Sequence, residues 1–321
     1  MSGAARRRIA LVSNPTAGKG RGMRAGAAVA QLLADRGHQV TDLTSETAAE
    51  ALDRSRAAVA AGTDALVVVG GDGMVHLGVN ACAGTDVPLG IVAAGTGNDV
   101  ARGVHLPTHD AVAAAACILE QLALGGRRVE AVRVTPDAGD VSGPDASGSA
   151  HRSSWFGGVL GAGFDAVVNE RANGWAWPRG RMRYNLAIAR ELPMFRPIRY
   201  ELTLDGQTEE LSAMLVAVAN GRSYGGGMQI APDARIDDGE LDVMVLAPLS
   251  TLEFVRVFPS VFSGTHVQHP AVSIRRARTV HLATLDTPVV GYADGERIAP
   301  LPLGCEVVPG AVRLLAPTPS P

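Results

Sequence analysis

The chain has 321 residues, of which 46% are hydrophobic, 19% charged and 4% aromatic, a composition that excludes a disordered chain and leaves room for two domains. Its formal charge of −3 provides no whole-molecule field that would attract nucleic acid irrespective of its sequence. Any attraction to an anionic surface must therefore be local.

Residues 8 to 130 alternate between strand-like and helix-like patterns. Strands are predicted over 8–12, 38–43, 65–69 and 89–93, and helices over 22–36, 48–61, 74–83 and 110–123. Such alternation predicts a parallel sheet with helices on both faces. Ligands of these sheets bind at the carboxyl ends of the strands.

The pattern changes after residue 130, where short β-type segments are separated by turn residues. They cover 129–135, 153–160, 198–204, 211–219, 241–246, 272–274, 279–282, 288–292 and 312–315. This spacing is typical of an antiparallel β-sandwich, and 136–150 is predicted to be an exposed hairpin loop. We therefore predict an α/β domain over 1–130 and a β-sandwich domain over 131–308, and leave open that a last strand, at about 309–321, returns to the first domain.

The cysteines and the apolar runs bear on the compartment. Cys82, Cys117 and Cys305 are odd in number and lack metal-ligand spacing, which indicates a reducing cytosol. The apolar run after Arg8 is too short for a signal peptide, and no run reaches the ~18 apolar residues of a membrane span. We expect a cytoplasmic protein that binds the inner membrane surface, if at all, peripherally and transiently.

Two glycine-rich turns follow strands of the predicted parallel sheet. They are Gly70-Gly71-Asp72-Gly73 and Gly95-Thr96-Gly97-Asn98-Asp99. Glycines let backbone N–H groups approach phosphate oxygens closely, and a helix N-terminus favours anions. An Asp in each turn suits Mg²⁺ or its waters. The two turns together predict a phosphate-binding site, whereas a single one is also compatible with an ordinary tight turn.

Two familiar nucleotide motifs are incomplete. A P-loop needs Ser or Thr directly after its Gly-Lys pair, and the chain has Gly20 after Gly18-Lys19. The dinucleotide fingerprint that could begin at Gly95 has Val100 in place of its third glycine. These departures argue against a nicotinamide-dependent dehydrogenase.

An ordered set of motifs resembles the soluble lipid kinases, above all the bacterial diacylglycerol kinases, which share a catalytic domain with sphingosine and ceramide kinases. The set is Asn14-Pro15-x-x-Gly18, Gly70-Gly71-Asp72-Gly73, Gly95-Thr96-Gly97-Asn98-Asp99, Tyr224-Gly225-Gly226-Gly227, Ala231-Pro232, Asp237-Asp238-Gly239, Leu241 and Asp294-Gly295-Glu296. The resemblance spans nearly the whole chain. It implies a first domain like those of phosphofructokinases and NAD kinases, which also carry Gly-Gly-Asp-Gly.

The resemblance implies an ATP site in the first domain. Its contacts would be Asn14, Pro15, Thr16, Ala17, Gly18, Thr44, Gly71, Asp72, Gly73, Met74, Val75, His76, Leu77 and Thr96. Asp72 and Asp99 would organise Mg²⁺ and water between the domains, with Glu130 where the family commonly has a third Asp. Met74 stands where the family often has Thr, so we expect backbone amides to carry more of the binding.

A second metal site is implied by residues 231–241, which resemble the family's structural cation loop. Asp238 would bind by its carboxylate and Arg235 and Glu240 by their carbonyls, because hard cations prefer oxygen ligands. A metal-free turn built on Asp-Asp-Gly is the alternative.

The catalytic base is expected in Asp294-Gly295-Glu296. A lipid hydroxyl loses its proton as it attacks the γ-phosphate, and a nearby carboxylate can accept it. By resemblance this role falls to Glu296, with Asp294 second, and Asp72 completes the catalytic set. Without the family order, the same three residues would simply indicate a hairpin turn.

Residues 174–199 combine aromatic and basic side chains. Trp175, Trp177, Tyr184 and Phe195 lie among Arg179, Arg181, Arg183, Arg190, Arg196 and Arg199. Interfacial aromatics with cations suit an anionic bilayer surface. A solvated basic helix covering the sandwich is the alternative, and nucleic acid is not an expected partner.

The prediction is an ATP- and Mg²⁺-dependent lipid kinase that converts 1,2-diacylglycerol to phosphatidic acid in a cleft between two domains. The alternatives are a kinase of another lipid alcohol (a sphingoid base, ceramide or phosphatidylglycerol), an NAD kinase-like enzyme, and a non-catalytic nucleotide or lipid sensor. The family includes dimers, so a homodimer stays open.

Overall fold

The computed structural model describes residues 6–108, 110–137, 154–175 and 181–318. It forms two compact units, Met1–Ala131 with Val308–Pro321, and Val132–Val307. The chain passes between the units in two strands, β5 (Arg127–Pro136) and β16 (Leu303–Leu314). Most of the predicted loop at 136–150 lies outside the described residues.

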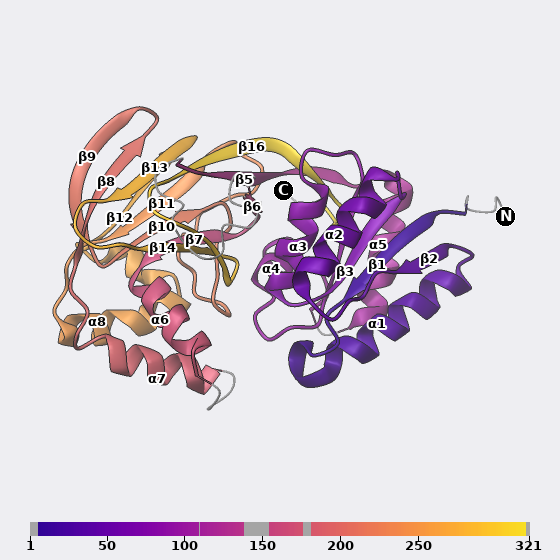
Figure 1. Ribbon diagram of the computed structural model, residues 1–321, viewed down its shortest axis with the longest axis horizontal. Coiled ribbons are helices and arrows are strands. Elements are labelled where there is room, and N and C mark those ends of the chain that lie inside the picture. The colour runs from indigo at the N-terminus through magenta and orange to yellow at the C-terminus, as the bar shows by residue number, and fades with distance from the viewer. Residues whose placement is uncertain (1–5, 109, 138–153, 176–180, 319–321) are drawn as a thin grey trace. The chain divides into compact units, whose positions relative to one another are not determined.

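The first unit is a parallel α/β layer structure (Figure 1). Its elements are β1 (Arg8–Ser13), α1 (Ala17–Asp35), β2 (Gln39–Asp42), α2 (Ala48–Ala60), β3 (Ala65–Gly70), α3 (Asp72–Cys82), β4 (Leu89–Ala93), α4 (Asp99–Gly103) and α5 (Ala111–Leu124). The strands run in the order β2-β1-β3-β4, and Leu314 at the end of β16 pairs in parallel with Leu89 of β4.

Both faces of this sheet are covered, which explains the continuous apolar run of β3. Val67 and Val69 face a core shared with α1 and α5, which contains Val29 and Ile118. Val68 lies on the other face near Gly78 of α3, where a Cβ would come within 3.0 Å of it. A strand buried on both sides cannot alternate polar and apolar residues.

The second unit consists of two β-sheets and a layer of helices (Figure 1). Its elements are β6 (Ser154–Phe156), β7 (Val159–Gly163), α6 (Phe164–Asn173), α7 (Arg181–Glu191), β8 (Ile198–Leu204), β9 (Gln207–Ala213), β10 (Leu215–Ala219), β11 (Leu241–Leu246), α8 (Thr251–Val257), the 3₁₀ helices η1 (Phe258–Phe262) and η2 (Thr265–Gln268), β12 (Val272–Ala277), β13 (Thr279–Thr284), β14 (Val290–Ala293) and β15 (Glu296–Pro300). One sheet has the order β12-β11-β10-β7-β14-β15 and is antiparallel throughout. The other contains β9, β8, β13 and β16, with β5 beside β16 and β6 beside β5.

The six-stranded sheet is buried on both faces. Val216 and Val218 of β10 belong to the core that also contains Tyr200 and Leu202 of the other sheet. Leu215, Ala217 and Ala219 face a second core formed with α6, α7 and α8. In that helical layer Phe164 packs edge-to-face on Phe195 and Phe254, with ring centroids 5.2 and 5.1 Å apart.

The predicted fold class, α/β followed by an antiparallel sandwich, is confirmed, while several predicted elements differ. Residues 153–160 do not form one strand, because Gly157 and Gly158 separate β6 from β7. Residues 211–219 are likewise divided at Met214 between β9 and β10, which belong to different sheets. Helices α4, α6 and α8 and strand β15 were not predicted. Among the described residues, no helix combines the length and apolar character needed to cross a bilayer.

Candidate active site

The carboxyl ends of β1, β3 and β4 bring three predicted turns to one edge of the first sheet. Strand β1 lies between β2 and β3 in the sheet order β2-β1-β3-β4. The chain therefore places β2 on one side of β1 and then reverses direction to place β3 on the other. Open parallel sheets bind ligands beside such a reversal point. The turns that follow β1, β3 and β4 contain Asn14, Gly71 and Gly95. The N–H of Asn14 donates to the carbonyl of Val69 at 2.9 Å and joins the first two turns.

The turns after β3 and β4 touch backbone to backbone. A Cβ on Gly71 would lie 3.3 Å from the Gly95 Cα, and a Cβ on Gly95 would collide with the Gly71 Cα. The N–H groups of Ala94 and Gly95 both donate to the Gly70 carbonyl, at 2.8 and 3.2 Å. These glycines are therefore required by the close approach of two main chains as well as by any ligand.

Asp72 connects the two turns through both carboxylate oxygens. Its Oδ2 accepts the Asn98 N–H at 2.8 Å, and its Oδ1 accepts the Asp99 N–H at 2.7 Å. Asn98 is left-handed (φ 57°), and its side-chain Oδ1 accepts the Gly95 N–H at 2.9 Å. Asp72 thus holds the second turn at the N-terminus of α3.

Asp99 is 5% exposed and forms an ion pair with Arg102, whose Nη2 lies 2.6 Å from Asp99 Oδ1. Arg102 also donates from Nη1 to the Gly97 carbonyl. Sequence reasoning did not find Arg102, although its position three residues after Asp99 on a helix is a recognisable ion-pair spacing.

The first turn has unusual backbone geometry. Asn14 Oδ1 accepts hydrogen bonds from the Thr16 N–H at 3.0 Å and from its hydroxyl at 2.8 Å. Helix α1 begins at Ala17, earlier than predicted, but it is interrupted by three left-handed residues, Gly18 (φ 56°), Lys19 (φ 62°) and Gly20 (φ 87°). Lys19 is the only lysine of the chain, and it is exposed.

Side chains of neighbouring elements hold this turn in place. Arg21 donates from Nε to the Gly18 carbonyl at 3.0 Å and from Nη2 to the Gly95 carbonyl at 3.1 Å. Thr44, after β2, accepts the Ser13 N–H on its hydroxyl at 3.1 Å. The predicted contact Thr44 therefore anchors its loop to β1.

The other residues that were predicted to contact ATP differ in the solvent exposure of their side chains. Met74, Val75 and Leu77 are buried in the first unit, so only their backbone is available to a ligand. Pro15 and Thr96 are exposed, and Ala17, Gly73 and His76 are partly buried.

These residues fit a phosphate chain with a divalent cation. The glycines keep side chains away from the place where the two turns meet, and the N-terminus of the 11-residue helix α3 favours an anion. Asp72 and Asp99 supply carboxylates, and Mg²⁺ typically takes one or two of these with phosphates and water. The third predicted acid, Glu130, is buried in β5. Within the described part of the chain, no group of three or more His, Cys, Asp or Glu could hold a metal by itself.

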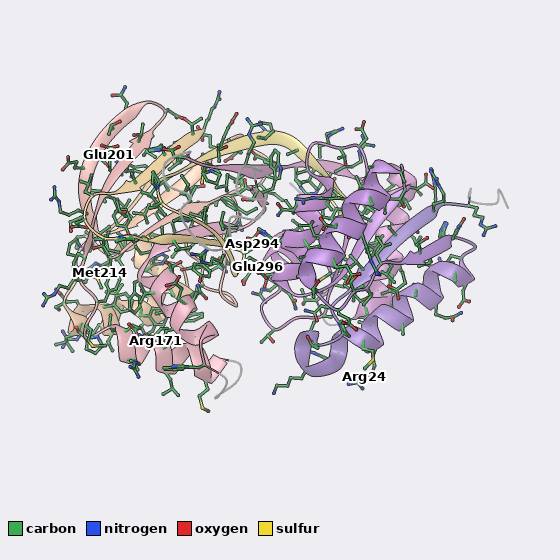
Figure 2. All side chains as sticks on the ribbon, viewed as in Figure 1. Arg24, Arg171, Glu201, Met214, Asp294 and Glu296 are labelled. Atoms are coloured by element: carbon green, nitrogen blue, oxygen red, sulfur yellow. The ribbon has the colours of Figure 1, made fainter. Side chains whose placement is uncertain are left out.

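In the second unit, Asp294 and Gly295 form the turn between β14 and β15 (Figure 2). Both are left-handed, with φ of 54° and 86°, as in a two-residue hairpin turn. Asp294 is 8% exposed, and its Oδ1 and Oδ2 accept the N–H groups of Gly158 and Gly157 at 3.0 and 3.1 Å. Glu296, the first residue of β15, is exposed.

Asn220, at the end of β10, holds the backbone that binds Asp294. Its Nδ2 donates to the Gly157 carbonyl at 3.0 Å, and its N–H donates to the Gly158 carbonyl at 2.9 Å. Asn220 is 1% exposed. Sequence reasoning missed it, because a single Asn after an apolar strand looks like an ordinary turn residue.

A second acid in this unit was also missed. Asp165 lies in the first turn of α6, and its Oδ2 accepts the Tyr224 hydroxyl at 3.3 Å. Burial raises the pKa of Asp165 to about 7, although hydrogen bonds from the Ala166 N–H and from Tyr224 oppose the shift. Tyr224 belongs to the motif Tyr224-Gly225-Gly226-Gly227, which was noted in the sequence. Asp165 lies 59 positions away along the chain, so the motif gave no indication of this partner.

Two arginine side chains contact acidic residues of the predicted cation loop. Arg235 directs its Nε to Asp237 at 3.2 Å, and Asp238 Oδ1 accepts the Glu240 N–H at 3.2 Å. Arg276 of β12 lies near Asp238, Glu240 and Asp242.

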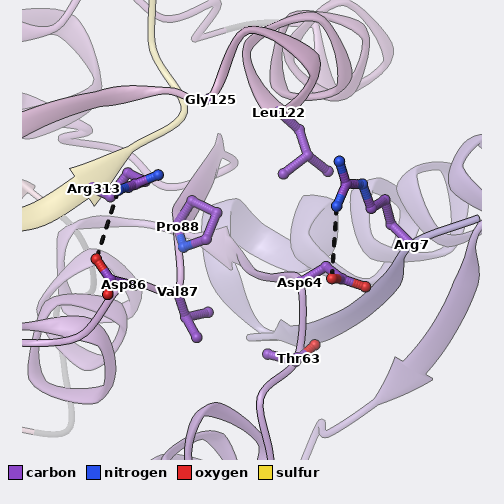
Figure 3. A pocket seen from close by; sticks show the side chains of 9 residues that line it. All are labelled: Arg7, Thr63, Asp64, Asp86, Val87, Pro88, Leu122, Gly125 and Arg313. Atoms are coloured by element: carbon purple, nitrogen blue, oxygen red, sulfur yellow. Dashed lines mark ion pairs between the residues drawn. The ribbon is translucent and has the colours of Figure 1, made fainter. Parts of the chain in front are cut away.

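One pocket of about 350 Å³ lies in the first unit, at the amino ends of β3 and β4 (Figure 3). Ion pairs between Arg7 and Asp64 (3.8 Å) and between Arg313 and Asp86 (3.6 Å) flank it. Because ligands of parallel sheets bind at the carboxyl ends, this pocket is not the candidate nucleotide site.

Two known family models match successive parts of the chain. Residues 8–128 match the model of the diacylglycerol kinase catalytic domain, and residues 158–316 match that of the YegS C-terminal NAD kinase beta sandwich-like domain. A curated relative is 41% identical over 97% of the chain. The chain belongs to the diacylglycerol kinase family.

That relative is a diacylglycerol kinase from Mycobacterium tuberculosis, and the alignment spans 312 residues and 95% of its length. A diacylglycerol kinase from Bacillus subtilis is 26% identical, with 92% of each chain covered. The crystal structure of a diacylglycerol kinase from Bacillus anthracis str. Sterne covers 97% of both chains with a TM-score of 0.67, at 20% identity, and supports the fold.

Proposed function

We propose that this chain transfers the γ-phosphoryl group of ATP to the free hydroxyl of diacylglycerol, giving phosphatidic acid and ADP. The observation that carries the proposal is the pair of glycine turns locked together by Asp72 at the carboxyl ends of β3 and β4. The 41% identity to a curated diacylglycerol kinase favours this lipid over other alcohols.

The first unit supplies the nucleotide site in this proposal. Backbone N–H groups at the start of α3 and in the turn after β4 would bind phosphate oxygens. Asn14, Thr16 and Thr44 shape the turn beside them. Lys19 would add a positive charge at the phosphates, and its exposure leaves it able to reach a bound ligand.

Asp72 and Asp99 would hold Mg²⁺, directly or through water. Each Asp72 oxygen accepts one backbone N–H, which orients the carboxylate at the turn after β4. When bound, the ion would neutralise charge on the β- and γ-phosphates. Arg102 orients the Asp99 carboxylate through its 2.6 Å ion pair.

Glu296 would accept the proton of the lipid hydroxyl. The two candidate carboxylates differ in their surroundings, since Asp294 is buried and receives two backbone N–H groups whereas Glu296 is exposed. Both Asp294 oxygens are engaged by backbone N–H groups, so in this proposal Asp294 fixes the hairpin that presents Glu296. The location of the reaction in a cleft between the domains stays a prediction.

The substrate implies action at a membrane surface. Helix α7 exposes Met182 and Leu186, which are 60% and 45% exposed, and Met194 follows at 65%. Arg190 lies on α7 as well, one further turn along from Leu186. This mixture of apolar and basic side chains would bind an anionic bilayer peripherally. Trp177 and Arg179 of the same predicted segment lie outside the described residues.

The decisive experiment is Glu296→Gln, assayed by transfer of radiolabelled phosphate from ATP to diacylglycerol in vesicles. We expect kcat to fall by about 10²-fold or more, because a general base contributes roughly 10²–10⁴-fold, while ATP binding persists. Glu209→Gln, an exposed glutamate on β9 of the same unit, is the matched control and should leave turnover unchanged. Unchanged turnover in Glu296→Gln would reject the assignment of the base.

The same assay across several acceptors separates the alternatives. Phosphorylation of a sphingoid base, ceramide or phosphatidylglycerol in preference to diacylglycerol would change the substrate but retain the kinase. Detergent-independent phosphorylation of NAD would indicate an NAD kinase-like enzyme. Nucleotide binding without transfer to any acceptor would indicate a sensor.

A further inference from the structure

The loop before β11 and the start of β11 together carry three carboxylates that an arginine of the neighbouring strand reaches. Asp238, Glu240 and Asp242 are spaced by two residues, and Arg276 is paired with Asp242 in the register of β11 and β12. Arg276 Nη1 lies 3.0 Å from Glu240 Oε2 and 3.6 Å from Asp238 Oδ2, and its Nε lies 3.4 Å from Asp242 Oδ1.

The carboxylates need a positive partner because the loop withdraws them from water. Asp242 has a side chain that is 6% exposed, and that of Asp238 is 20% exposed. The Arg276 guanidinium lies among these groups and supplies the positive charge that carboxylates withdrawn from water need.

The guanidinium has the geometry for this position. A planar guanidinium carries several N–H groups and can donate hydrogen bonds to carboxylates on different sides at once. An ammonium group does this less well. The loop is fixed further by Arg222, whose Nε donates to the Ala234 carbonyl at 3.3 Å. Asp238 Oδ1, the carboxylate oxygen opposite the one that Arg276 approaches, is used by the Glu240 N–H.

We propose that the side chain of Arg276 occupies the place of the structural cation that the resemblance implies at residues 231–241. The loop then obtains its positive charge from β12, through a residue whose position is set by strand register, and its folded form is independent of divalent cations. Arg235, Asp238 and Glu240 remain loop residues but hold no metal.

The test measures thermal unfolding of the purified full chain without nucleotide, in EDTA and in excess Mg²⁺. Asp238→Asn identifies any contribution from this loop, because Mg²⁺ bound elsewhere, for example at Asp72, would stabilise wild type and variant equally. We expect the Mg²⁺-induced change in midpoint to be the same in both proteins. A Mg²⁺ stabilisation of wild type that Asp238→Asn abolishes would overturn the proposal.

Arg276→Gln provides the complementary measurement. It should lower the midpoint in EDTA and create a new Mg²⁺ stabilisation of roughly 3 °C or more, since the three carboxylates lose their cation. The double variant with Asp238→Asn should lose this new response. Arg275→Gln, which removes the neighbouring pair with Glu209, is the control and should create no Mg²⁺ response.

A response of Arg276→Gln equal to that of wild type would contradict the proposal. If Arg276→Gln does not fold, the comparison of wild type with Asp238→Asn still decides the question. Neither measurement depends on kinase activity, so failure here is distinguishable from failure of the proposed function.

Discussion

At the scale of single residues, the candidate catalytic turn depends on hydrogen bonds from distant parts of the second unit. Asp294 is held by two N–H groups more than 130 positions earlier in the chain, and these groups are held in turn by Asn220. Asn220 touches no reacting atom in the proposed mechanism. It is a positioning residue, acting on Glu296 through Gly157, Gly158 and Asp294.

Asn220→Ala should therefore lower kcat while the KM for ATP stays unchanged. The lost hydrogen bond leaves the partly buried Gly157 carbonyl without this donor, which should also lower the free energy of unfolding by about 1 kcal/mol. Steady-state kinetics and urea denaturation measure the two effects. Asn220→Asp, which places a carboxylate against that carbonyl, should be worse in both. A variant that loses stability but keeps kcat would show that the role is structural alone.

Asp165 makes the stability of the fold depend on pH. Burial raises its pKa to about 7 from an ordinary value of 3.8, so between these values the folded state binds more protons than the unfolded state. The free energy of unfolding should therefore decrease as pH rises from about 4 to about 7, by at most about 1.4 kcal/mol per pH unit. Urea denaturation of wild type and Asp165→Asn across this range measures the effect, and the variant should lack this part of the slope.

Tyr224→Phe serves as the control for Asp165. The Tyr224 hydroxyl lowers the pKa of Asp165, so its removal should extend the decline in stability to higher pH. Identical pH profiles for wild type and Asp165→Asn would show that Asp165 does not titrate differently in the folded state.

At the scale of elements, the interruption of α1 places Lys19 in a conformation that favours glycine. A left-handed non-glycine residue costs roughly 1–2 kcal/mol, and Lys19 has a φ of 62°. Such strain at a glycine-rich turn is consistent with a role for the side chain.

Lys19→Gly should leave the melting temperature unchanged or raise it, and should increase the KM for ATP severalfold, because the ammonium is lost. Lys19→Met keeps the backbone strain and removes only the charge, so it should raise KM to the same extent without the gain in stability. Calorimetry and ATP titrations distinguish the variants. An unchanged KM in both would exclude contact between Lys19 and phosphate.

The bounds of strands were predicted correctly where the local sequence pattern alone sets them. Strand β4 and strand β11 have the predicted bounds, since their apolar runs are limited by polar or turn residues. The boundary at Met214 was missed, because β9 and β10 form one continuous β-type segment whose two parts enter different sheets. Which sheet a strand joins depends on partners far along the chain.

At the scale of the whole molecule, a net charge of −3 coexists with a local surface that we propose binds an anionic membrane. Leu186 and Met194 represent the exposed apolar side chains of that surface, and Arg190 and Arg196 its cations. Apolar contact acts on any bilayer, whereas cations near anionic lipid contribute about 1 kcal/mol each and are screened by salt.

Replacing Arg190 and Arg196 by Glu should weaken binding to anionic vesicles by tenfold or more and flatten its salt dependence, with little change for neutral vesicles. Replacing Leu186 and Met194 by Ser should weaken binding to both kinds. Vesicle sedimentation over a range of salt concentrations measures these effects. Equal binding of wild type to neutral and anionic vesicles would contradict the electrostatic part.

The sequence by itself determined the fold class and the glycine turns after β3 and β4, because periodicity and glycine requirements are properties of short segments. It also pointed to Asp72, Asp294 and Glu296. Only the tertiary structure decided that Asp72 binds the turn of Asp99, that Asn220 supports Asp294, and that Arg276 lies among three carboxylates. These relations arise from strand register and turn geometry between distant positions, which no local pattern encodes.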